Sequence, residues 1–312
     1  MVYLIVLVLI FIFELLYFRI ANRYNIIDKP NERSSHTQIT FRGGGIVFWL
    51  SALLYLSFHF STQSLWFFIG ISVISIVSFA DDVVGLGQMI RFLSHLLAIT
   101  CVFVFANVFN TFPWWAIAIG YFVLAGIVNA YNFMDGINGI TGLYSLVVLS
   151  LLQYVNYYIA PFVEPNMIWF PMIASVVFLF FNFRKQAMCF AGDVGSTSIA
   201  FWVVTLLLLL VMETNNLIWL GFLMVYGVDS VCTILYRIYL KQNILQAHRM
   251  HLYQVLTNER GMGHRVVATI YAVVQLIVSV LIIWLYPVVA AVVLVVAAVV
   301  LVGVYVRAVN SE

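Results

Sequence analysis

The sequence predicts an all-α fold: a polytopic integral membrane protein with about eleven transmembrane helices, its N-terminus outside and its C-terminus cytoplasmic. Three observations lead to this prediction. Hydrophobic residues make up 64% of the 312 residues, and the mean hydropathy is +1.08. Charged residues make up only 8%, against roughly 25% in an ordinary soluble domain. These few charges are gathered in short segments that separate long apolar stretches.

A helix needs roughly 17–25 apolar residues to cross a bilayer. Eleven stretches reach or approach that length, in the order Val2–Phe18, Ile46–Phe60, Leu65–Ala80, Phe92–Phe109, Trp114–Ala130, Ile140–Ile159, Met167–Phe181, Thr197–Met212, Leu217–Tyr236, Val266–Tyr286 and Pro287–Val306. The last two form one long apolar run that we divide at Pro287, because proline interrupts a helix. The first lacks a basic leader and a small-residue cleavage site, so we expect a retained helix and not a signal peptide.

The orientation follows from Lys and Arg, which concentrate in short cytoplasmic loops. Basic residues occur within 19–42, at Arg91, at Arg184 and Lys185, within 237–265 and at Arg307. Four apolar stretches separate Arg91 from Arg184, and an even number of crossings returns the chain to the same side. We therefore expect all basic segments on the cytoplasmic face.

We expect one membrane-embedded domain over residues 1–312, with active-site loops at about 19–45, 80–91, 129–140, 182–197 and 237–265. The net charge of +2 gives no support to nucleic-acid binding, and the basic loops are suited to anionic lipid headgroups instead. The 3 cysteines are scattered and lack metal-binding spacing, so they predict neither a disulfide framework nor a zinc site.

Two of the polar segments are rich in carboxylates, although the chain has only 12 acidic residues. Asp81 and Asp82 are adjacent at the end of an apolar stretch, and Mg²⁺ held by one or two carboxylates and substrate phosphates would offset their repulsion. A solvated acidic loop end is the alternative. Asp193 precedes Ser196 at the start of another stretch, where free helix amides could bind phosphate and Asp193 a cation. Simple N-capping is the alternative there.

The segment 129–139 contains Asn132, Asp135 and Asn138, with glycines that allow tight turns. Its amides could recognise uracil or ribose edges, and Asp135 could accept a hydrogen bond from hydroxyls or support a metal. A turn that only joins two helices is the alternative.

The longest polar segment contains His248 and His251, three residues apart, with Arg249 beside them. On a helix they would share a face and could bind a diphosphate, whereas zinc is less suitable because no further ligand has the required spacing. A surface histidine pair is the alternative. In the first loop, Gly43, Gly44 and the following glycine could serve close backbone packing or an oxyanion cradle.

Two acidic residues fall inside apolar stretches, and ionisable groups at depth are functional candidates. Asp229 could face the active-site cleft. For Glu14 the sequence suggests only pairing with a neighbouring helix.

Together and in this order, these segments resemble the polyprenyl-phosphate N-acetylhexosamine-1-phosphate transferase superfamily, glycosyltransferase family 4. The matching pieces are Lys29-Pro30, Arg33-Ser34-Ser35-His36, Arg42-Gly43-Gly44, Asp81-Asp82, Asn132-Phe133-Met134-Asp135-Gly136, Gly192-Asp193-Val194-Gly195-Ser196 and His248-Arg249-x-His251-Leu252-Tyr253-Gln254. Each piece alone is weakly specific, and the ordered set is specific. The last piece is more similar to the branch that initiates bacterial O-antigen or capsule than to the peptidoglycan branch, whose segment carries three consecutive histidines.

The resemblance implies transfer of an N-acetylhexosamine 1-phosphate from a UDP-sugar to undecaprenyl or another polyprenyl phosphate, with release of UMP. It also implies dependence on Mg²⁺, with Mn²⁺ as a substitute, and an active site on the cytoplasmic face of a bacterial inner membrane. By resemblance, the metal ligands would be Asp193 and Asp82. The catalytic residues would be Asp81, Asp82, Asp135, His248, Arg249 and His251. The substrate-binding residues would be Lys29, Arg33, His36, Arg42, Gly43, Gly44, Asn132, Asn138, Asn182 and Ser196.

The chain departs from the family pattern at Asn138, where an acid is common, and the interval from Asn182 to Asp193 is one residue longer than usual. A transporter or flippase for a lipid-linked or nucleotide sugar is the alternative function. A transporter would have polar residues near the bilayer midplane, in interrupted helices at corresponding positions of the two halves of the chain. A scaffold of a glycan-assembly complex would leave the carboxylates unused. The donor sugar, whether N-acetylglucosamine or a related N-acetylated hexosamine, and the formation of a homodimer stay open.

Overall fold

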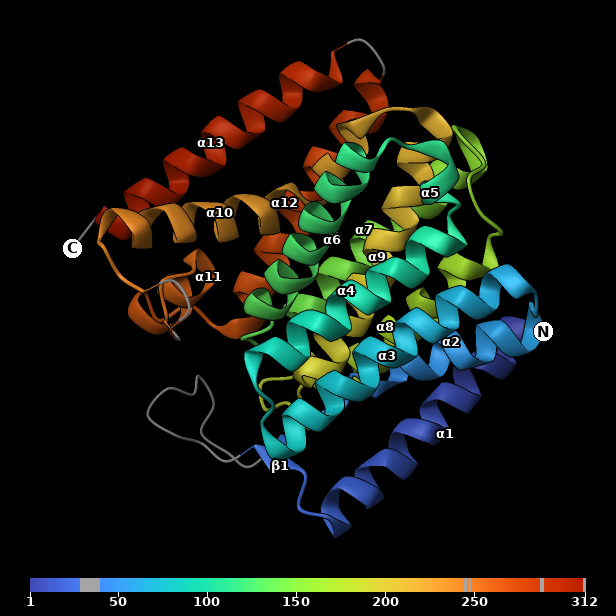
Figure 1. The fold of residues 1–312 in the computed structure, drawn as a ribbon. Helices are drawn as coiled ribbons and strands as arrows, with labels where there is room; N and C mark the ends of the chain where they lie inside the picture. Colours follow the sequence, from blue (N-terminus) through green and yellow to red (C-terminus); the bar gives the residue numbers. More distant parts are fainter. Residues whose placement is uncertain (29–39, 244–245, 247, 287–288, 311–312) are drawn as a thin grey trace.

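The computed structural model describes residues 1–28, 40–243, 246, 248–286 and 289–310, and in this part the protein is a bundle of helices (Figure 1). The predicted all-α class is confirmed. The helices of one turn or more are α1 Val2–Arg23, α2 Ile46–Phe58, α3 Thr62–Val84, α4 Gln88–Phe105, α5 Val108–Thr111, α6 Trp114–Met134, α7 Ile140–Tyr158, α8 Asn166–Asn182, α9 Gly192–Thr214, η1 Leu217–Leu223, α10 Met224–Tyr239, η2 Val255–Glu259, α12 His264–Leu285 and α13 Ala290–Asn310. The short turn α11 covers Leu252–Gln254, and β1 Ile27–Asp28 pairs with β2 Thr40–Phe41.

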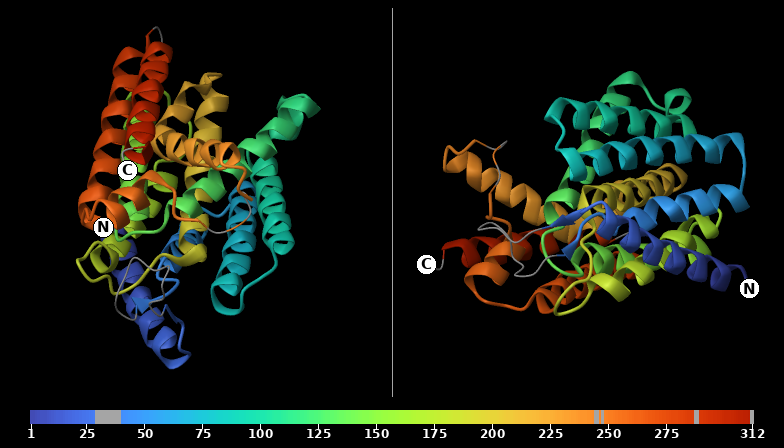
Figure 2. Two further views of the ribbon diagram at one scale, coloured as in Figure 1. Left: turned by 90° about the vertical axis from the view of Figure 1, so that its left-hand side faces the viewer. Right: turned by 90° about the horizontal axis from the view of Figure 1, so that it is seen from below.

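The predicted apolar stretches coincide with helices. Within the described residues, nine helical segments are long and apolar enough to cross a membrane, and α2 and α8 are shorter apolar helices. Each of the eleven stretches overlaps one of these segments. The number of crossings and the orientation stay predictions. The start of α1 and the end of α13 lie at opposite ends of the bundle in two views (Figures 1 and 2).

Helix α9 is the centre of the bundle. It packs against α2, α3, α6 and α7. In its most apolar segment of 18 residues, 83% of the residues are buried. Its sequence is apolar on all sides, which is typical of an interior helix. Its buried hydroxyls bond to its own backbone, as Thr205 donates to Phe201 O, and to α3, as Thr197 donates to the hydroxyl of Ser78. Because α9 is central, its first turn lies where the surrounding loops can meet.

The stretch Leu217–Tyr236, which we predicted as one helix, is divided into η1 and α10. Gln275 of α12 compensates for the break. Its side-chain amide donates to Gly221 O at 3.0 Å, and its oxygen accepts from Val225 N at 3.0 Å. Backbone groups released inside a membrane protein need such internal partners. The break lets α10 leave the direction of its neighbours and run toward the polar end (Figure 1).

The polar segments converge at one end of the bundle. The first loop joins the segment before α9: Gly44 N donates to Phe190 O at 2.8 Å and Gly45 N to Ala191 O at 3.1 Å. A Cβ added at Gly45 would lie 2.2 Å from the Cα of Gly195. This contact requires glycine, because any side chain would separate the two backbones.

Candidate active site

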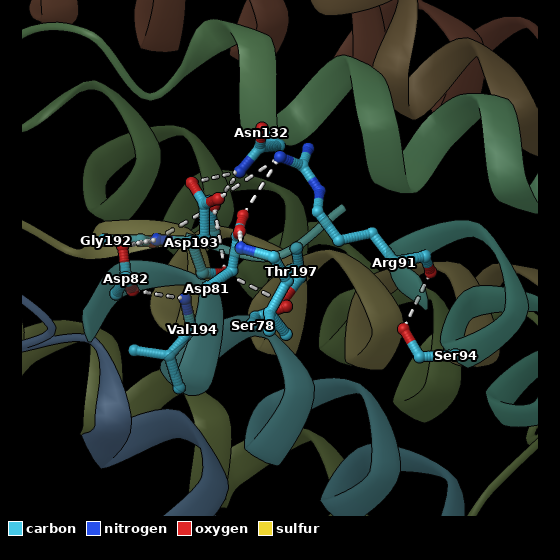
Figure 3. Close-up of polar contacts among 12 residues, drawn as sticks. Ser78, Asp81, Asp82, Arg91, Ser94, Asn132, Gly192, Asp193, Val194 and Thr197 are labelled. Atoms are coloured by element: carbon cyan, nitrogen blue, oxygen red, sulfur yellow. Dashed lines mark hydrogen bonds and ion pairs between the residues drawn. The ribbon is translucent and has the colours of Figure 1, made fainter. Parts of the chain in front are cut away.

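A cluster of two carboxylates, one guanidinium and one amide lies at the start of α9; we call Asp81, Arg91, Asn132 and Asp193 the aspartate cluster (Figure 3). Arg91 Nη1 lies 3.0 Å from Asp81 Oδ2 and 3.9 Å from Asp193 Oδ2. The Asp193 side chain is 30% exposed and that of Asp81 is 9% exposed. Three helices, α3, α4 and α9, therefore direct charged groups to one point that solvent can reach.

Asn132, near the end of α6, orients Asp193. Its Nδ2 donates to Asp193 Oδ1 at 2.9 Å and to the hydroxyl of Ser196 at 3.0 Å. Ser196 is fully buried and donates in turn to Gly192 O. With Oδ1 held by Asn132, the other carboxylate oxygen of Asp193 is turned toward Arg91.

Asp82 has a different environment from its neighbour Asp81. Its side chain is buried, and its two oxygens accept from the backbone amides of Asp193 and Val194, each at 3.0 Å (Figure 3). Arg42 Nε lies 3.1 Å from Asp82 Oδ1. Asp82 is thus the cap of α9, a role that satisfies free amides and suits the positive end of a helix.

This arrangement bears on two expectations. Each oxygen of Asp82 accepts a hydrogen bond from a backbone amide, and its expected roles as a metal ligand and in catalysis stay predictions. We also expected free amides at the start of α9 to bind phosphate. Two of them, at Asp193 and Val194, are instead occupied by Asp82.

Two glycines of the first loop pack closely against the segment before α9, as in one of the two alternatives left open by the sequence. The amides of Gly44 and Gly45 donate to carbonyl oxygens of the segment before α9, so they are not available to an oxyanion. Gly43 has φ +78°, and a Cβ on Gly44 would lie 2.6 Å from Cys189 Sγ. Lys29, Arg33 and His36, three predicted substrate contacts, lie outside the described residues.

Asp135 follows α6 and is half-buried beside the aspartate cluster. Burial raises the pKa of this carboxyl to about 7, and the charges of Asp193 and Asp82 contribute to the increase. A carboxyl group that titrates near neutral pH can change its charge under working conditions, as groups at functional sites often do.

Two predicted substrate ligands hold the loops together through their side-chain amides. Asn182 is buried; its oxygen accepts from Gly139 N and its Nδ2 donates to Cys189 O at 2.8 Å. Both ends of its amide are therefore used within the protein. Asn138 donates to Arg184 O at 3.0 Å, while its buried Oδ1 has no partner among the described residues. Asn182 therefore joins two loops, and the substrate contacts expected of Asn182 and Asn138 stay predictions.

The His248–Gln254 loop (residues 248–254) meets the corner between α6 and α7 from the other side. Tyr253 donates to Phe133 O at 3.0 Å. A Cβ at Gly136 would lie 2.1 Å from the Tyr253 hydroxyl, so this corner requires glycine for close approach. The loop and the aspartate cluster thus share one structural element, the end of α6.

The three predicted diphosphate ligands of this loop differ in accessibility. Arg249 is exposed, His248 is half-buried and His251 is buried. Burial, followed by the nearby His251 and Arg237, lowers the pKa of His248 to about 4. His248 is therefore a neutral hydrogen-bonding group at pH 7, and Arg249 is the permanent cation among the three.

Sequence reasoning missed Arg91 as a site residue, because it was used only to orient the chain. A signal was present: Arg91 lies in the first turns of α4, directly after the glycine-containing turn that follows Asp81. Such a short connection between two antiparallel helices returns the chain to the carboxylates.

Comparison with known proteins identifies a family model that matches this region. Residues 64–211 match the model of glycosyl transferase family 4. The matched region contains the whole aspartate cluster, together with Asp82, Asp135 and Ser196. The match covers just under half of the chain.

Curated relatives of the family extend the match. A probable undecaprenyl-phosphate N-acetylglucosaminyl 1-phosphate transferase of Bacillus subtilis is 25% identical over 280 residues, which is 84% of this chain and 78% of the relative. The undecaprenyl-phosphate alpha-N-acetylglucosaminyl 1-phosphate transferase of Escherichia coli K12 is 25% identical over 226 residues, 65% of this chain and 61% of the relative. A phospho-N-acetylmuramoyl-pentapeptide-transferase of Streptococcus pneumoniae is 33% identical over 111 residues, 35% of this chain and 33% of the relative. The resemblance to polyprenyl-phosphate N-acetylhexosamine-1-phosphate transferases is confirmed.

Proposed function

We propose that this family 4 transferase passes an N-acetylhexosamine 1-phosphate from a UDP-sugar to undecaprenyl phosphate, releases UMP and thereby starts a cell-surface glycan. The observation that supports it most directly is the aspartate cluster at the polar end of an apolar bundle. The acceptor's tail can stay in hydrocarbon there while its phosphate reaches charged side chains. The printed names of the relatives in Bacillus and Escherichia support the same reaction. We place the active site on the cytoplasmic face of a bacterial inner membrane, where nucleotide sugars are present.

The residues of the cluster fit a magnesium ion. Asp81 and Asp193 both face Arg91, so two carboxylates share one protein cation. The described residues contain no group of three or more His, Cys, Asp or Glu side chains that could enclose a metal. This suits Mg²⁺, which usually takes one or two carboxylates and completes its shell with substrate phosphates and water. Asp193 would hold the ion, with Asp81 beside it, and the ion would neutralise charge on the phosphates.

The protein's own cations meet the main electrostatic problem of the reaction. Two phosphates must approach each other, and two unit charges at 4 Å repel by about 4 kcal/mol at an effective dielectric near 20. Arg91 in the cluster and Arg249 on the loop provide positive charge on the two sides of the corner. Asp135 would accept a hydrogen bond from a donor hydroxyl.

The acceptor phosphate is largely dianionic at neutral pH because its second pKa is near 6, so it needs positioning more than deprotonation. We propose direct in-line attack of the lipid phosphate on the sugar-bearing phosphate, with a covalent aspartyl intermediate as the alternative.

The test is UMP release by the purified protein with undecaprenyl phosphate, Mg²⁺ and a panel of UDP-N-acetylhexosamines. Asp193→Asn is expected to reduce the rate by about 100-fold or more. Glu213→Gln is the matched control, because Glu213 lies near the other end of the same helix. UMP release that needs lipid and Asp193 but not Glu213 would support the transferase and identify the donor. Absence of UMP release across the panel, from folded protein, would contradict the proposal.

A further inference from the structure

The carboxylate of Asp229 in α10 is buried outside the aspartate cluster and contacts three consecutive residues of the His248–Gln254 loop. Its Oδ1 accepts from Leu252 N at 2.9 Å and lies 3.2 Å from His251 Nδ1. Its Oδ2 accepts from Tyr253 N at 3.4 Å and from the hydroxyl of Tyr271 at 2.6 Å. The carboxylate is only 3% exposed, so these groups take the place of water.

His251 belongs to the same buried arrangement. A carboxylate only accepts hydrogen bonds, so the contact with Asp229 requires a hydrogen on Nδ1 of His251. The opposite nitrogen, Nε2, is buried and has no hydrogen-bond partner in the described part of the chain. The ring lies between aromatic groups, with ring centroids 6.2 Å from Phe133 and 5.8 Å from Tyr253.

Helices α10, α12 and α13 all contribute to this contact region. Tyr271 comes from α12, and Tyr305 of α13 donates to Met250 O at 3.3 Å. Thr233, one turn after Asp229 on α10, also donates to Asp229 Oδ1. Among these groups only Asp229 bonds to both backbone amides that begin α11.

We infer that Asp229 is a positioning residue: it anchors the loop through His251, Leu252 and Tyr253 so that His248 and Arg249 face the donor. His251 then belongs to the anchor and does not contact substrate. This inference rests on the proposed function for the identity of the donor, and on the contacts alone for the anchoring. Tyr253 links the anchor to the corner that carries Asp135, through its bond to Phe133 O.

Amide hydrogen exchange of the full-length protein tests the anchoring without any substrate. Peptides that cover residues 250–256 are followed in the wild type, Asp229→Ala and Asp229→Asn. Loss of an ionised acceptor is expected to speed exchange at Leu252 and Tyr253 by about tenfold or more in Asp229→Ala. Asp229→Asn keeps the size of the side chain and one acceptor, so a smaller increase is expected and folding is better preserved.

Glu14→Gln is the control for replacing a buried carboxyl group elsewhere in the described part of the protein. Glu14 is 0% exposed and accepts from Cys189 Sγ, and no described contact links it to the His248–Gln254 loop. It is expected to leave exchange at residues 250–256 unchanged. Unchanged exchange in Asp229→Ala, or an equal increase in Glu14→Gln, would overturn the inference.

The activity assay then separates positioning from general destabilisation. Asp229→Asn is expected to lower kcat for UMP release by about tenfold at a temperature well below its own unfolding midpoint, where the variant is fully folded. A variant that loses stability but keeps kcat would contradict a positioning role. If the wild type releases no UMP, the proposed function fails, while the exchange experiment still decides whether Asp229 anchors the loop.

Discussion

The aspartate cluster and the His248–Gln254 loop both contact the end of α6, and they are built in different ways. In the cluster, polar side chains bond to one another, and the carboxylates stay partly exposed. In the loop, the buried carboxylate of Asp229 accepts hydrogen bonds from backbone amides, and the side chain of Arg249 is exposed. The first arrangement suits charged ligands that enter and leave. The arrangement in the loop fixes the conformation of the backbone.

The same contrast occurs between two adjacent residues. Asp81 accepts from one backbone amide, that of Leu86, and its other oxygen faces Arg91 in the cluster. Asp82 resembles Asp229, because it is buried and accepts from two backbone amides at the start of a helix. The two carboxylates that look equivalent in the sequence therefore have separate tasks. One presents charge, and the other fixes the helix that presents Asp193.

The largest expected effect separates these two neighbours. Asp82→Asn is expected to lower the free energy of unfolding by about 2–3 kcal/mol, because it removes an ionised acceptor from buried amides. Asp81→Asn is expected to change that free energy by less than about 1 kcal/mol, because its ion pair is partly solvated. It is expected to reduce UMP release by about 100-fold. Thermal unfolding and the UMP assay on both variants measure the difference. Equal losses of stability in the two variants would show that the neighbours are not distinct.

Much of this site could be predicted from residue types, while the partners of each residue could not. Asp81, Asn132 and Asp193 are predicted as site residues from motifs. The structure brings Asp81 and Asp193 to Arg91, and Asn132 to Asp193. The sequence does not say which of two adjacent carboxylates turns inward. That choice depends on where the first turn of α9 lies, and α9 is more than 100 residues further along the chain.

Buried polar residues were the least predictable. Asn182 looked like a ligand because its neighbours matched a motif, but its amide joins Gly139 to Cys189. Asp229 had no assigned partner, because its partners lie in a loop and in α12. Apolar length predicts helices well, since each stretch must cross the same bilayer thickness. Hydrogen bonds between helices depend on packing, which a single sequence does not contain.

A pH profile examines the corner that both regions share. Burial raises the pKa of Asp135 to about 7, so this carboxyl is protonated below that pH and ionised above it. If the ionised form accepts a hydrogen bond from the donor, kcat/KM is expected to increase from pH 6 to pH 8, with a value at pH 6 about tenfold below the plateau. Asp135→Asn is expected to remove this dependence, which distinguishes it from titration of the lipid phosphate. A profile in Asp135→Asn that keeps the wild-type midpoint would assign the titration to another group.

The smallest expected effect concerns α13, the outermost helix that contacts the loop. Tyr305→Phe removes one neutral hydrogen bond, from the Tyr305 hydroxyl to Met250 O, which is worth about 0.5–1.5 kcal/mol. UMP release is therefore expected to decrease only a few-fold, and exchange at Leu252 and Tyr253 to increase less than in Asp229→Ala. Tyr154→Phe, an exposed tyrosine on α7, is the control and is expected to match the wild type. If Tyr305→Phe were as damaging as Asp229→Asn, the loop would be held from α13 as much as from α10, and the buried carboxylate would no longer be its main anchor.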